Sequence, residues 1–454
     1  MDMVRADHTS LHGYARDTTP RLSAFGQGDG VTVADACFSH SNRTFQSVPS
    51  MLTGVHPSRH QIGMGKQPGK LPASIDTAPE VLSAAGYRTL GISENGYAGP
   101  GTGLDERFDR FLETHELVSL PRRHSFSLIK YLFQTRRHGP GLSPTKAAHA
   151  KQKSYFTMDV AKRELRSYAN GRYPVFCYVH FNDTHTPFIP PKSLLQEYTE
   201  QINADPLTAL DVAIRMHEHP DQLIADGVTQ RQIDSIEAMY DATIKYVDRC
   251  VGALINFFES KFEETIVVVT SDHGVLLGEY GLLKHRTMLH DGNIHVPLVL
   301  SGIPGIKDNL AAPIGHIDVM QTLLSSVGAN TDGFHGVDLR EEIPDKTISQ
   351  LQPGSYQDIL ERNPQFDVSF FPESILTALR TSQFKYLHTN EWSRLYRLPD
   401  EKTDIKSEFS DIHSNLDGAF KKFTHGVGEP IDAHPVQVDY SESTKKHLQD
   451  MGYL

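Results

Sequence analysis

The chain has 454 residues, of which 38% are hydrophobic and 22% charged, the composition of a globular protein with a large core. Its 56 acidic and 44 basic residues give a formal net charge of −12, which argues against a nucleic-acid-binding surface, since such surfaces are basic. The 3 cysteines are too few for a disulfide framework, so the sequence as written is expected to be cytoplasmic. The longest apolar run, near Val175–Val179, is far too short to cross a membrane, and the charged first residues do not resemble a signal peptide.

Four segments carry a clear secondary-structure pattern. Pro174–Phe181 is a short apolar run rich in β-branched and aromatic residues, which is typical of a buried strand. Ser235–Phe258 has apolar residues at helical spacing and predicts a long amphipathic helix. Thr265–Asp272 and His295–Gly302 are continuous β-branched runs of the kind found in parallel sheets covered on both faces. This alternation predicts an α/β fold, a three-layer sandwich with a mostly parallel central sheet.

The remaining segments are less regular. Arg122–Lys153 and Gln201–Arg231 are polar and irregular in pattern, and we expect them to be insertions or lids around the sheet. Ala378–Glu401 alternates as two strands around a turn, which predicts a small antiparallel C-terminal subdomain, and the polar tail beyond it is expected to be poorly ordered. These patterns divide the chain into a catalytic domain, residues 1–335, and a C-terminal subdomain with a tail, residues 336–454.

Two segments carry chemistry. Asp272 and His273 end the strongest predicted strand, where ligands sit in open α/β sheets, and an oxygen ligand beside an imidazole suits a divalent metal. The alternative is a turn in which Asp272 caps a helix. In the second segment, Asn42–Gly63, a hydroxyl residue precedes a short apolar helix closed by Gly54. The amino end of a helix can hold an anionic sulfate or phosphate.

Collinear motifs along the chain resemble the sulfatase family of the alkaline phosphatase superfamily. The motifs are Asp2–Leu22, Pro49–Gly63, Ala85–Thr89, His180–Phe188, Thr270–Gly274 with Gly278–His285, His295–Gly302, His316–Gly328, and Arg380–Leu387 with Arg394–Leu398. They lie in the family's order and span nearly the whole chain. The resemblance implies an alkaline phosphatase-like fold and a metal-dependent ester hydrolase.

The resemblance also implies roles for individual residues. Asp2 falls on the family's first metal-binding aspartate, and Asp272 with His273 on its second metal-binding pair. Thr44, ten positions before Gly54, falls on the nucleophile and becomes a fourth ligand. The cofactor implied is one divalent ion, Mn²⁺, Mg²⁺, Ca²⁺ or Zn²⁺.

The sequence departs from the sulfatase pattern at three places. Thr44 stands where many sulfatases have a Cys or Ser that becomes formylglycine, and Val48 stands where an arginine would follow. Cys37 lies seven residues too early to replace it and is expected to be a buried small residue. Met3 replaces the second aspartate of an Asp-Asp pair, and Glu94–Gly96 replaces a Lys-Trp-His segment. The remaining residues are Asp2, Thr44, Asp272 and His273. This set resembles the single-metal, threonine-nucleophile site of lipoteichoic acid synthases and, less fully, of nucleotide pyrophosphatases.

This set of residues implies a mechanism. Thr44 would attack sulfur or phosphorus in line and form a covalent intermediate, which water hydrolyses. His285 is expected to protonate the leaving oxygen, and His185 to contact the substrate. Lys284 and Arg286 either contact an anionic substrate or are solvated, and the second is favoured slightly.

Three functions are compatible with the sequence. The first is a hydrolase of small-molecule or glycan sulfate or phosphate esters, with phosphoesters slightly favoured because Thr44 cannot become formylglycine. The second is a phosphoglycerol-type transferase. The third is a non-catalytic protein that binds sulfated or phosphorylated glycans, since Met3 and Glu94 replace groups of the arylsulfatase site. The oligomeric state is not indicated by the sequence.

The start of the chain raises a separate expectation. The resemblance places Asp2 after a buried strand, yet only Met1 precedes it, so the first strand is expected to be missing. The true start then lies upstream or the chain is a fragment, and an upstream segment could also hold a signal or an anchor. Without that strand Asp2 is expected to fray and to bind metal weakly.

Overall fold

The computed structural model describes residues 1–65, 69–115, 124–138, 152–169, 171–306, 310–431, 436–437 and 445. The α-helices that build the main layers are α1 Pro20–Gly26, α2 Thr44–Thr53, α4 Ala78–Ala84, α6 Ser154–Arg166, α10 Gln230–Lys261 and α12 His316–Ser326. Further α-helices are α3 Pro57–His60, α5 Ser125–His138, α7 Lys192–Gln201, α8 Pro206–Glu218, α9 Pro220–Asp226, α11 Asp291–Ile294, α13 Gln357–Arg362 and α14 Ser410–Thr424. None of the described helices has the length and apolar character needed to cross a membrane.

The main strands form two separate sheets that lie side by side. The first has the order β10-β1-β9-β6, with β10 Ile314–Gly315, β1 Val31–Phe38, β9 His295–Ser301 and β6 Val267–Thr270. The second has the order β4-β3-β5, with β4 Arg110–Glu113, β3 Arg88–Ser93 and β5 Val175–His180. The α/β class is therefore confirmed, but the strands do not make one continuous sheet. Short pairs are β7 Leu276–Leu277 with β8 Leu283–Lys284, and β2 Gly69–Lys70 with β15 Val436–Gln437.

The second sheet is parallel, whereas β9 runs antiparallel to both β1 and β6. The expectation that His295–Gly302 is a further parallel strand was therefore wrong. A parallel return needs a crossover of a dozen or more residues, usually a helix. The connection from β6 to β9 contains the β7–β8 pair, the three-residue η7 Glu279–Gly281 and the four-residue α11, but no helix long enough to carry the chain back along the sheet, so β9 returns antiparallel beside β6.

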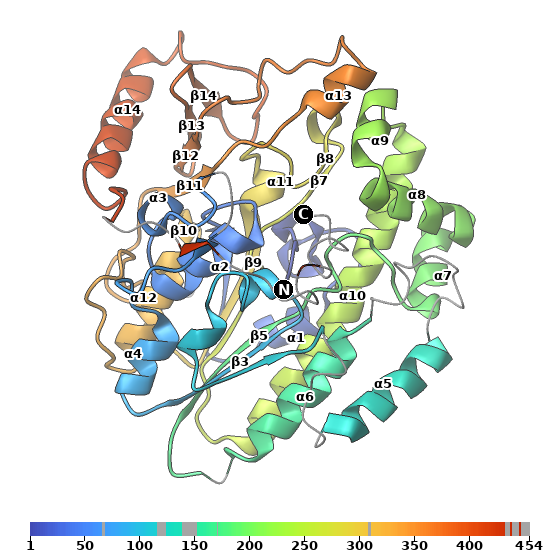
Figure 1. Ribbon diagram of the computed structural model, residues 1–454, viewed down its shortest axis with the longest axis vertical. Helices are drawn as coiled ribbons and strands as arrows, with labels where there is room; N and C mark the ends of the chain where they lie inside the picture. The colour runs from blue at the N-terminus through green and yellow to red at the C-terminus, as the bar shows by residue number, and fades with distance from the viewer. Residues whose placement is uncertain are drawn as a thin grey trace.

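Helices cover both faces of the sheets, as the side chains of β5 show. Val175, Cys177 and Val179 pack into a core with residues of α6 and α10. Phe176 and Tyr178, which point to the opposite face, pack into a second core with residues of α2, α4 and α12. Because side chains alternate between the faces of a strand, β5 must lie between two helical layers. Figure 1 shows the long α10 beside the strands, with the N-terminus in the middle of the molecule.

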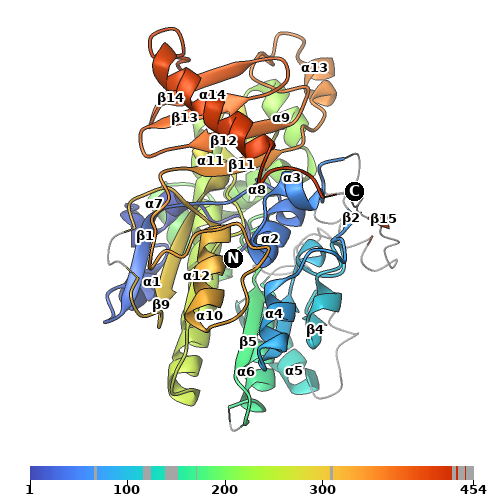
Figure 2. The ribbon, with the colours of Figure 1, turned by 90° about the vertical axis from the view of Figure 1, so that its left-hand side faces the viewer.

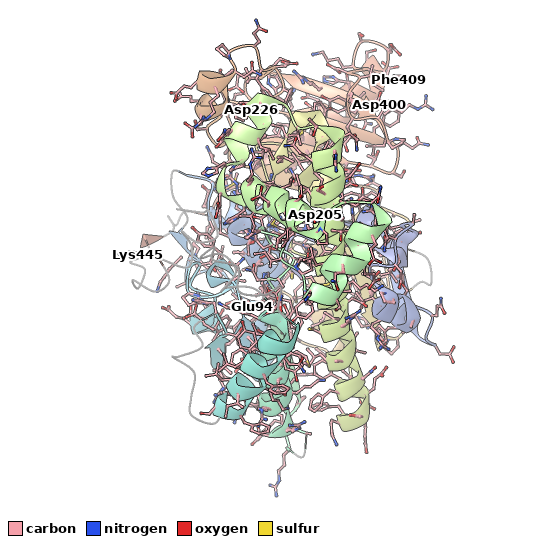
Figure 3. The ribbon with its side chains drawn as sticks, turned by 90° about the vertical axis from the view of Figure 1, so that its right-hand side faces the viewer. Glu94, Asp205, Asp226, Asp400, Phe409 and Lys445 are labelled. Carbon is pink, nitrogen blue, oxygen red and sulfur yellow. The ribbon has the colours of Figure 1, made fainter. Side chains whose placement is uncertain are left out.

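The expected helix at Ser235–Phe258 lies within α10, which begins after Thr229 in a capping box with Gln232. The segment Gln201–Arg231 was expected to be irregular, but it contains helices α8 and α9. Asp205 caps α8 by accepting a hydrogen bond from the Thr208 amide, and each helix begins at a proline. Figure 3 labels Asp205, at the start of α8. The expected segment Arg122–Lys153 contains α5, and much of the rest of it lies outside the described residues.

The C-terminal part forms an antiparallel sheet of four strands in the order β11-β12-β13-β14, drawn at the top of Figure 2. Their bounds are β11 Thr347–Leu351, β12 Leu376–Arg380, β13 Phe384–His388 and β14 Ser393–Arg397. The segment Ala378–Glu401 thus holds parts of three strands where two were expected, because two tight turns break it. The described residues 402–431 of the tail include α14, whose Leu416 and Phe423 pack against this sheet, contrary to the expectation of poor order there. Most of the tail after Ile431 lies outside the described residues.

Candidate active site

The candidate site lies where β5 and β6 end and where α2 begins, and residues at the start of the chain close it. The amide of Asp2 donates to the carbonyl of Phe181 at 2.9 Å, and the amide of Asp272 donates to the carbonyl of Met1 at 3.1 Å. The amide of Met3 donates to Asp272 Oδ1 at 3.1 Å. Asp2 is fully buried. The expectation that Asp2 frays is therefore not met, because its backbone is tied to the ends of both strands.

Asp2, His180 and Asp272 form a group that fits a metal ion. One ligand atom from each lies within 4.8 Å of the others, and all three residues are buried. Asp2 Oδ1 and Asp272 Oδ2 accept no hydrogen bond from the described residues. Because a buried carboxylate oxygen without a partner is costly, these two oxygens suit a divalent cation. From the sequence, His180 was expected only to pack at the end of its strand and not to belong to the metal site. In the structure its Nε2 lies 3.1 Å from Asp2 Oδ2.

The carboxylate of Asp2 is ionised in this setting. Burial alone would raise its pKa, but the hydrogen bond from His180 and the nearby imidazoles of His185 and His273 hold the pKa of Asp2 well below its ordinary value. An ionised carboxylate is the form that binds a cation. The donor set, two carboxylates with imidazole nitrogens, suits a divalent cation.

Thr44 is the first residue of α2, and its hydroxyl lies beside this group. Thr44 Oγ1 is 3.3 Å from His273 Nε2. The side-chain amide of Asn95 donates to Asp2 Oδ2 at 2.7 Å and lies 3.4 Å from Thr44 Oγ1. The helix that presents Thr44 ends at Gly54, whose φ of 64° is left-handed and whose Cβ, if present, would lie 2.2 Å from Phe334.

The ring of His273 is oriented by its own backbone surroundings. His273 Nδ1 lies 2.8 Å from the carbonyl of Gly274, so this nitrogen carries the proton and donates it. The lone pair of Nε2 then faces Thr44 and the Asp272 carboxylate, whose Oδ2 is 3.6 Å away. This is the orientation that a metal-binding imidazole requires.

Two further histidines, His185 and His285, lie close to His273. The ring of His285 has its centroid 5.6 Å from that of His273 and 6.0 Å from that of His185. His185 is fully buried, and its Nδ1 lies 2.9 Å from the carbonyl of Thr186. Burial, together with the adjacent His273, His185 and Lys284, lowers the pKa of His285 well below its ordinary value. His285 is therefore neutral until an anion arrives to offset these effects.

Lys284 is not solvated, contrary to the slightly favoured expectation. It is only 7% exposed and has a positive φ of 66°. Burial, together with the charge of Arg286, lowers the pKa of Lys284 to about 8. Arg286 is ion-paired with Asp221 of α9, so the segment expected to be a lid does reach the rim of the site. The buried cation next to His285 makes this side of the site attractive to an anion.

Glu94 and Asn95 stand where the sulfatase pattern has a Lys-Trp-His segment, and both are buried beside the site. Glu94 Oε2 accepts from the Asn182 amide at 3.1 Å, beside Asp183, which accepts from the amides of Gln152 and Ser154. Burial, followed by the negative charge of Asp183, raises the pKa of Glu94 to about 8. The hydroxyl of Ser154, the first residue of α6, lies 3.5 Å from Glu94 Oε2, and Figure 3 labels Glu94. The two residues thus supply a buried acid and the amide that links Asp2 to Thr44.

Cys37 plays no part in this arrangement. It is buried on β1 in a core with Ala34 and Val296. Burial raises the pKa of its thiol, so the reactive thiolate is disfavoured. The three cysteines are all free.

An α/β fold with buried carboxylates, imidazoles and a hydroxyl at the carboxyl ends of its strands defines a hydrolytic enzyme acting on esters. The chain belongs to the sulfatase family, whose model matches residues 1–329. Sulfatases are metal-dependent hydrolases, and the orphaned carboxylate oxygens of Asp2 and Asp272 agree with that.

Individual relatives support this assignment. The chain is 30% identical over 205 residues to arylsulfatase K of Mus musculus, a match that covers 42% of this chain and only 36% of that protein. It is 23% identical over 442 residues to an ulvan-active sulfatase of Formosa agariphila, covering 92% of this chain and 79% of that protein. The fold is similar to that of the phosphonate monoester hydrolase of Agrobacterium radiobacter, with a TM-score of 0.68, 19% identity and 94% of each chain covered.

Proposed function

We propose that the chain hydrolyses phosphate or sulfate esters with Thr44 as the nucleophile, and that phosphoesters are preferred. The observation that carries this proposal is the position of Thr44 Oγ1, 3.3 Å from His273 Nε2 at the amino end of α2. A nucleophile needs a neighbouring group that favours its ionised form and a place for the reacting oxygens. The buried hydroxyl of Thr44 has both.

The metal would be held by Asp2, Asp272, His273 and Thr44, with His180 as a further candidate ligand that adjoins Asp2. When bound there, a divalent cation would lower the pKa of the Thr44 hydroxyl and offset the charge of the substrate oxygens. The presence of imidazole ligands favours Mn²⁺ or Zn²⁺ over Ca²⁺ or Mg²⁺.

The chain's own side chains perform the remaining steps. The buried ammonium of Lys284 and the positive end of the α2 dipole, where Thr44 lies, attract the anionic ester. Thr44 gives its hydroxyl proton to solvent, and its Oγ1 then forms the bond to phosphorus or sulfur while the bond to the leaving oxygen breaks. The bound anion raises the pKa of His285 again, so that His285 can give a proton to that oxygen. Water then releases the covalent group from Thr44.

The preference for phosphoesters follows from the side chain at position 44. Formylglycine gives sulfatases a hemiacetal route for releasing sulfate, and a threonine has no such route. Val48 also stands where that modification motif has its arginine. A phosphothreonine can instead be hydrolysed by direct attack of water on phosphorus. We also propose a small-molecule or glycan ester as substrate, residues 1–335 as the catalytic domain, and residues 336–454 as a subdomain that supports it.

An ester panel tests this proposal. With Mn²⁺ present, we expect turnover of p-nitrophenyl phosphate or bis-p-nitrophenyl phosphate to exceed that of p-nitrophenyl sulfate. Thr44→Ala should lower kcat/KM by about 10³-fold or more, the loss typical of removing a nucleophile. Thr53→Ala, at the other end of the same helix, is the matched control and should keep most activity. Unchanged turnover in Thr44→Ala would contradict the proposal, and product transfer to added glycerol would favour the transferase function.

A further inference from the structure

Helix α5 carries a group of exposed apolar side chains on one face. Eight large apolar side chains of the described residues are well exposed, and four of them lie on this one helix. They are Phe126, Ile129, Leu132 and Phe133, with exposed fractions of 56%, 61%, 56% and 64%. Their spacing of three and four residues places them on one side of an α-helix, which we call the α5 face. A contiguous group of exposed apolar side chains marks a contact with an apolar partner.

The opposite side of α5 holds the helix to the rest of the protein. The ring of Tyr131 packs beside that of Phe156 of α6, with the ring centroids 5.8 Å apart. The hydroxyl of Ser127 donates to Asp159 Oδ2, also of α6, at 2.6 Å. Figure 1 draws α5 at the edge of the molecule, beside α6. The α5 face therefore points away from α6 and from the core.

The sequence around α5 is basic, although the chain as a whole is acidic. Residues 117–158 contain no aspartate or glutamate, whereas the formal net charge of the chain is −12. The basic residues in this stretch are Arg122, Arg123, Lys130, Arg136, Arg137, Lys146, Lys151 and Lys153. An uninterrupted basic stretch in an acidic chain favours an anionic partner at this place.

Two cations also lie at the α5 face itself. The ammonium nitrogen of Lys130 is 5.3 Å from the ring centre of Phe126, and the guanidinium carbon of Arg163 is 4.9 Å from it. One carboxylate, that of Asp159, is ion-paired with both cations, so their charge is only partly offset. The apolar side chains and the positive charge thus occur together.

We propose that the α5 face docks this protein on an anionic lipid bilayer, with α5 lying in the plane of the membrane surface. An amphipathic helix that binds in this way buries its apolar side chains at the boundary between headgroups and acyl chains. Lysine and arginine residues around it are attracted to the anionic headgroups. A bilayer of this kind matches both features of α5, the apolar face and the basic surroundings. The proposal does not depend on the ester hydrolysis proposed above.

Other partners match only one of the two features. An anionic glycan or a nucleic acid would pair with the basic residues but would leave the four apolar side chains in water. A second copy of the chain would bring an equally basic α5 face against the first one, which repels it. The four side chains together expose on the order of 400 Å², whereas a stable protein interface buries about 800 Å² on each partner.

The test measures binding of the full chain to lipid vesicles by co-sedimentation. One set of vesicles is phosphatidylcholine alone, and the other is a mixture of phosphatidylcholine with phosphatidylglycerol, which is anionic. We expect the partition coefficient for the anionic vesicles to be about tenfold higher or more, and about 0.5 M NaCl to remove most of the difference, because salt screens surface charge. Hydrogen exchange with anionic vesicles present should slow at residues 125–135 of α5 and stay unchanged in α8.

A variant of the α5 face separates the apolar contact from charge alone. Ile129→Ser combined with Phe133→Ser should lower the partition coefficient for anionic vesicles by about tenfold or more. Leu207→Ser is the matched control, because this leucine is 70% exposed on α8, and it should bind as the parent chain does. Since all these side chains are exposed, both proteins should keep the Tm of the parent. If the double variant loses its fold, the single variant Leu132→Ser takes its place, with a smaller expected loss.

Three results would overturn the inference. The first is that the chain binds neither set of vesicles, the second is equal binding of both sets at low salt, and the third is undiminished binding by the folded α5 variant. Binding to heparin in place of vesicles would assign the basic stretch to an anionic glycan. A dimer in solution that the α5 variant breaks, again without vesicle binding, would assign the α5 face to a second copy of the chain.

Discussion

Thr44 Oγ1 and His273 Nε2 lie 3.3 Å apart although 229 positions separate them in the sequence. One begins a helix that follows β1, and the other follows the end of β6, so the sheet brings them together. Asn95, which follows β3, joins them through its contact with Thr44 and its bond to Asp2. Residues from four parts of the chain therefore meet at the carboxyl ends of the strands, as expected for an open α/β sheet.

Removing one metal ligand should weaken ion binding without unfolding the protein. Asp272→Asn is expected to raise the Kd for Mn²⁺ by about 100-fold or more, because it removes a charged ligand. His180→Ala is expected to raise it by about 10-fold, because it removes a group that adjoins Asp2. Isothermal titration after chelator treatment measures both. Asp248→Asn is the matched control, since this buried aspartate accepts hydrogen bonds from Arg21 and Leu22 far from the site. Equal loss of Mn²⁺ affinity in the control would mean that the effect is structural.

Replacing His285 should affect esters according to their leaving groups. If His285 protonates the leaving oxygen, His285→Ala should lower kcat/KM by about 10²-fold or more for an alkyl phosphate, whose oxygen needs a proton. For p-nitrophenyl phosphate, whose leaving group is stable as an anion, the loss should be about tenfold or less. The comparison within one variant is its own control. A loss that is equal for both esters would assign His285 to binding rather than to proton transfer.

Glu94 should make the protein less stable as the pH rises. Its pKa in the folded protein is about 8, raised by burial and by Asp183, whereas in the unfolded chain it keeps the ordinary value of 4.5. Between these values only the folded state holds the proton, so stability is full below about pH 4.5 and falls until about pH 8. Glu94→Gln should flatten the decrease of Tm over this range when metal is removed by a chelator. The exposed Glu200→Gln is the control and should leave the slope unchanged.

Lys385 should hold the C-terminal sheet to the rest of the protein. This lysine is fully buried on β13, and its Nζ lies 2.5 Å from both Asp291 and Glu401 and 3.1 Å from the Leu289 carbonyl. Lys385→Met would leave the buried carboxylate of Glu401 without its cation, while Asp291 keeps its ion pair with Arg380. We expect this to cost about 3–5 kcal/mol in the free energy of unfolding. The exposed pair of Lys346 with Asp345 is the comparison, and Lys346→Met should cost about 0.5 kcal/mol or less. Denaturant unfolding of both variants gives the answer, and similar midpoints would refute the role of Lys385.

The sequence was informative wherever a segment's own pattern decides its structure. The apolar runs at Pro174–Phe181 and Thr265–Asp272 became β5 and β6, and the helical spacing of Ser235–Phe258 became α10. The direction of β9 was not predictable from its composition, because it depends on how the chain returns after β6. The helix α14 was missed although its sequence carries the signal, since Ile412, Leu416, Phe420 and Phe423 recur at helical spacing and pack with the C-terminal sheet.

The site residues likewise divide into those that a sequence motif marks and those that only the three-dimensional structure identifies. Thr44, Asp272 and His273 were found from motifs, and the structure brings them together, but their roles stay predictions. Asn95 and His180 were missed because their importance depends on distances to Asp2, which no local pattern records. His180 ends β5 as Asp272 follows β6, so the rule that ligands gather at the carboxyl ends of strands could have singled it out.

Trapping the covalent intermediate on Thr44 tests the central claim most directly. The enzyme is mixed with Mn²⁺ and bis-p-nitrophenyl phosphate, quenched in acid within the first turnovers, digested and analysed by mass spectrometry. We predict a p-nitrophenyl phosphoryl ester on the hydroxyl of Thr44, formed with release of one p-nitrophenolate, within the peptide that contains α2, and none in Thr44→Ala. Turnover of the ester with the modification on another residue, or with full activity retained in Thr44→Ala, would contradict the account.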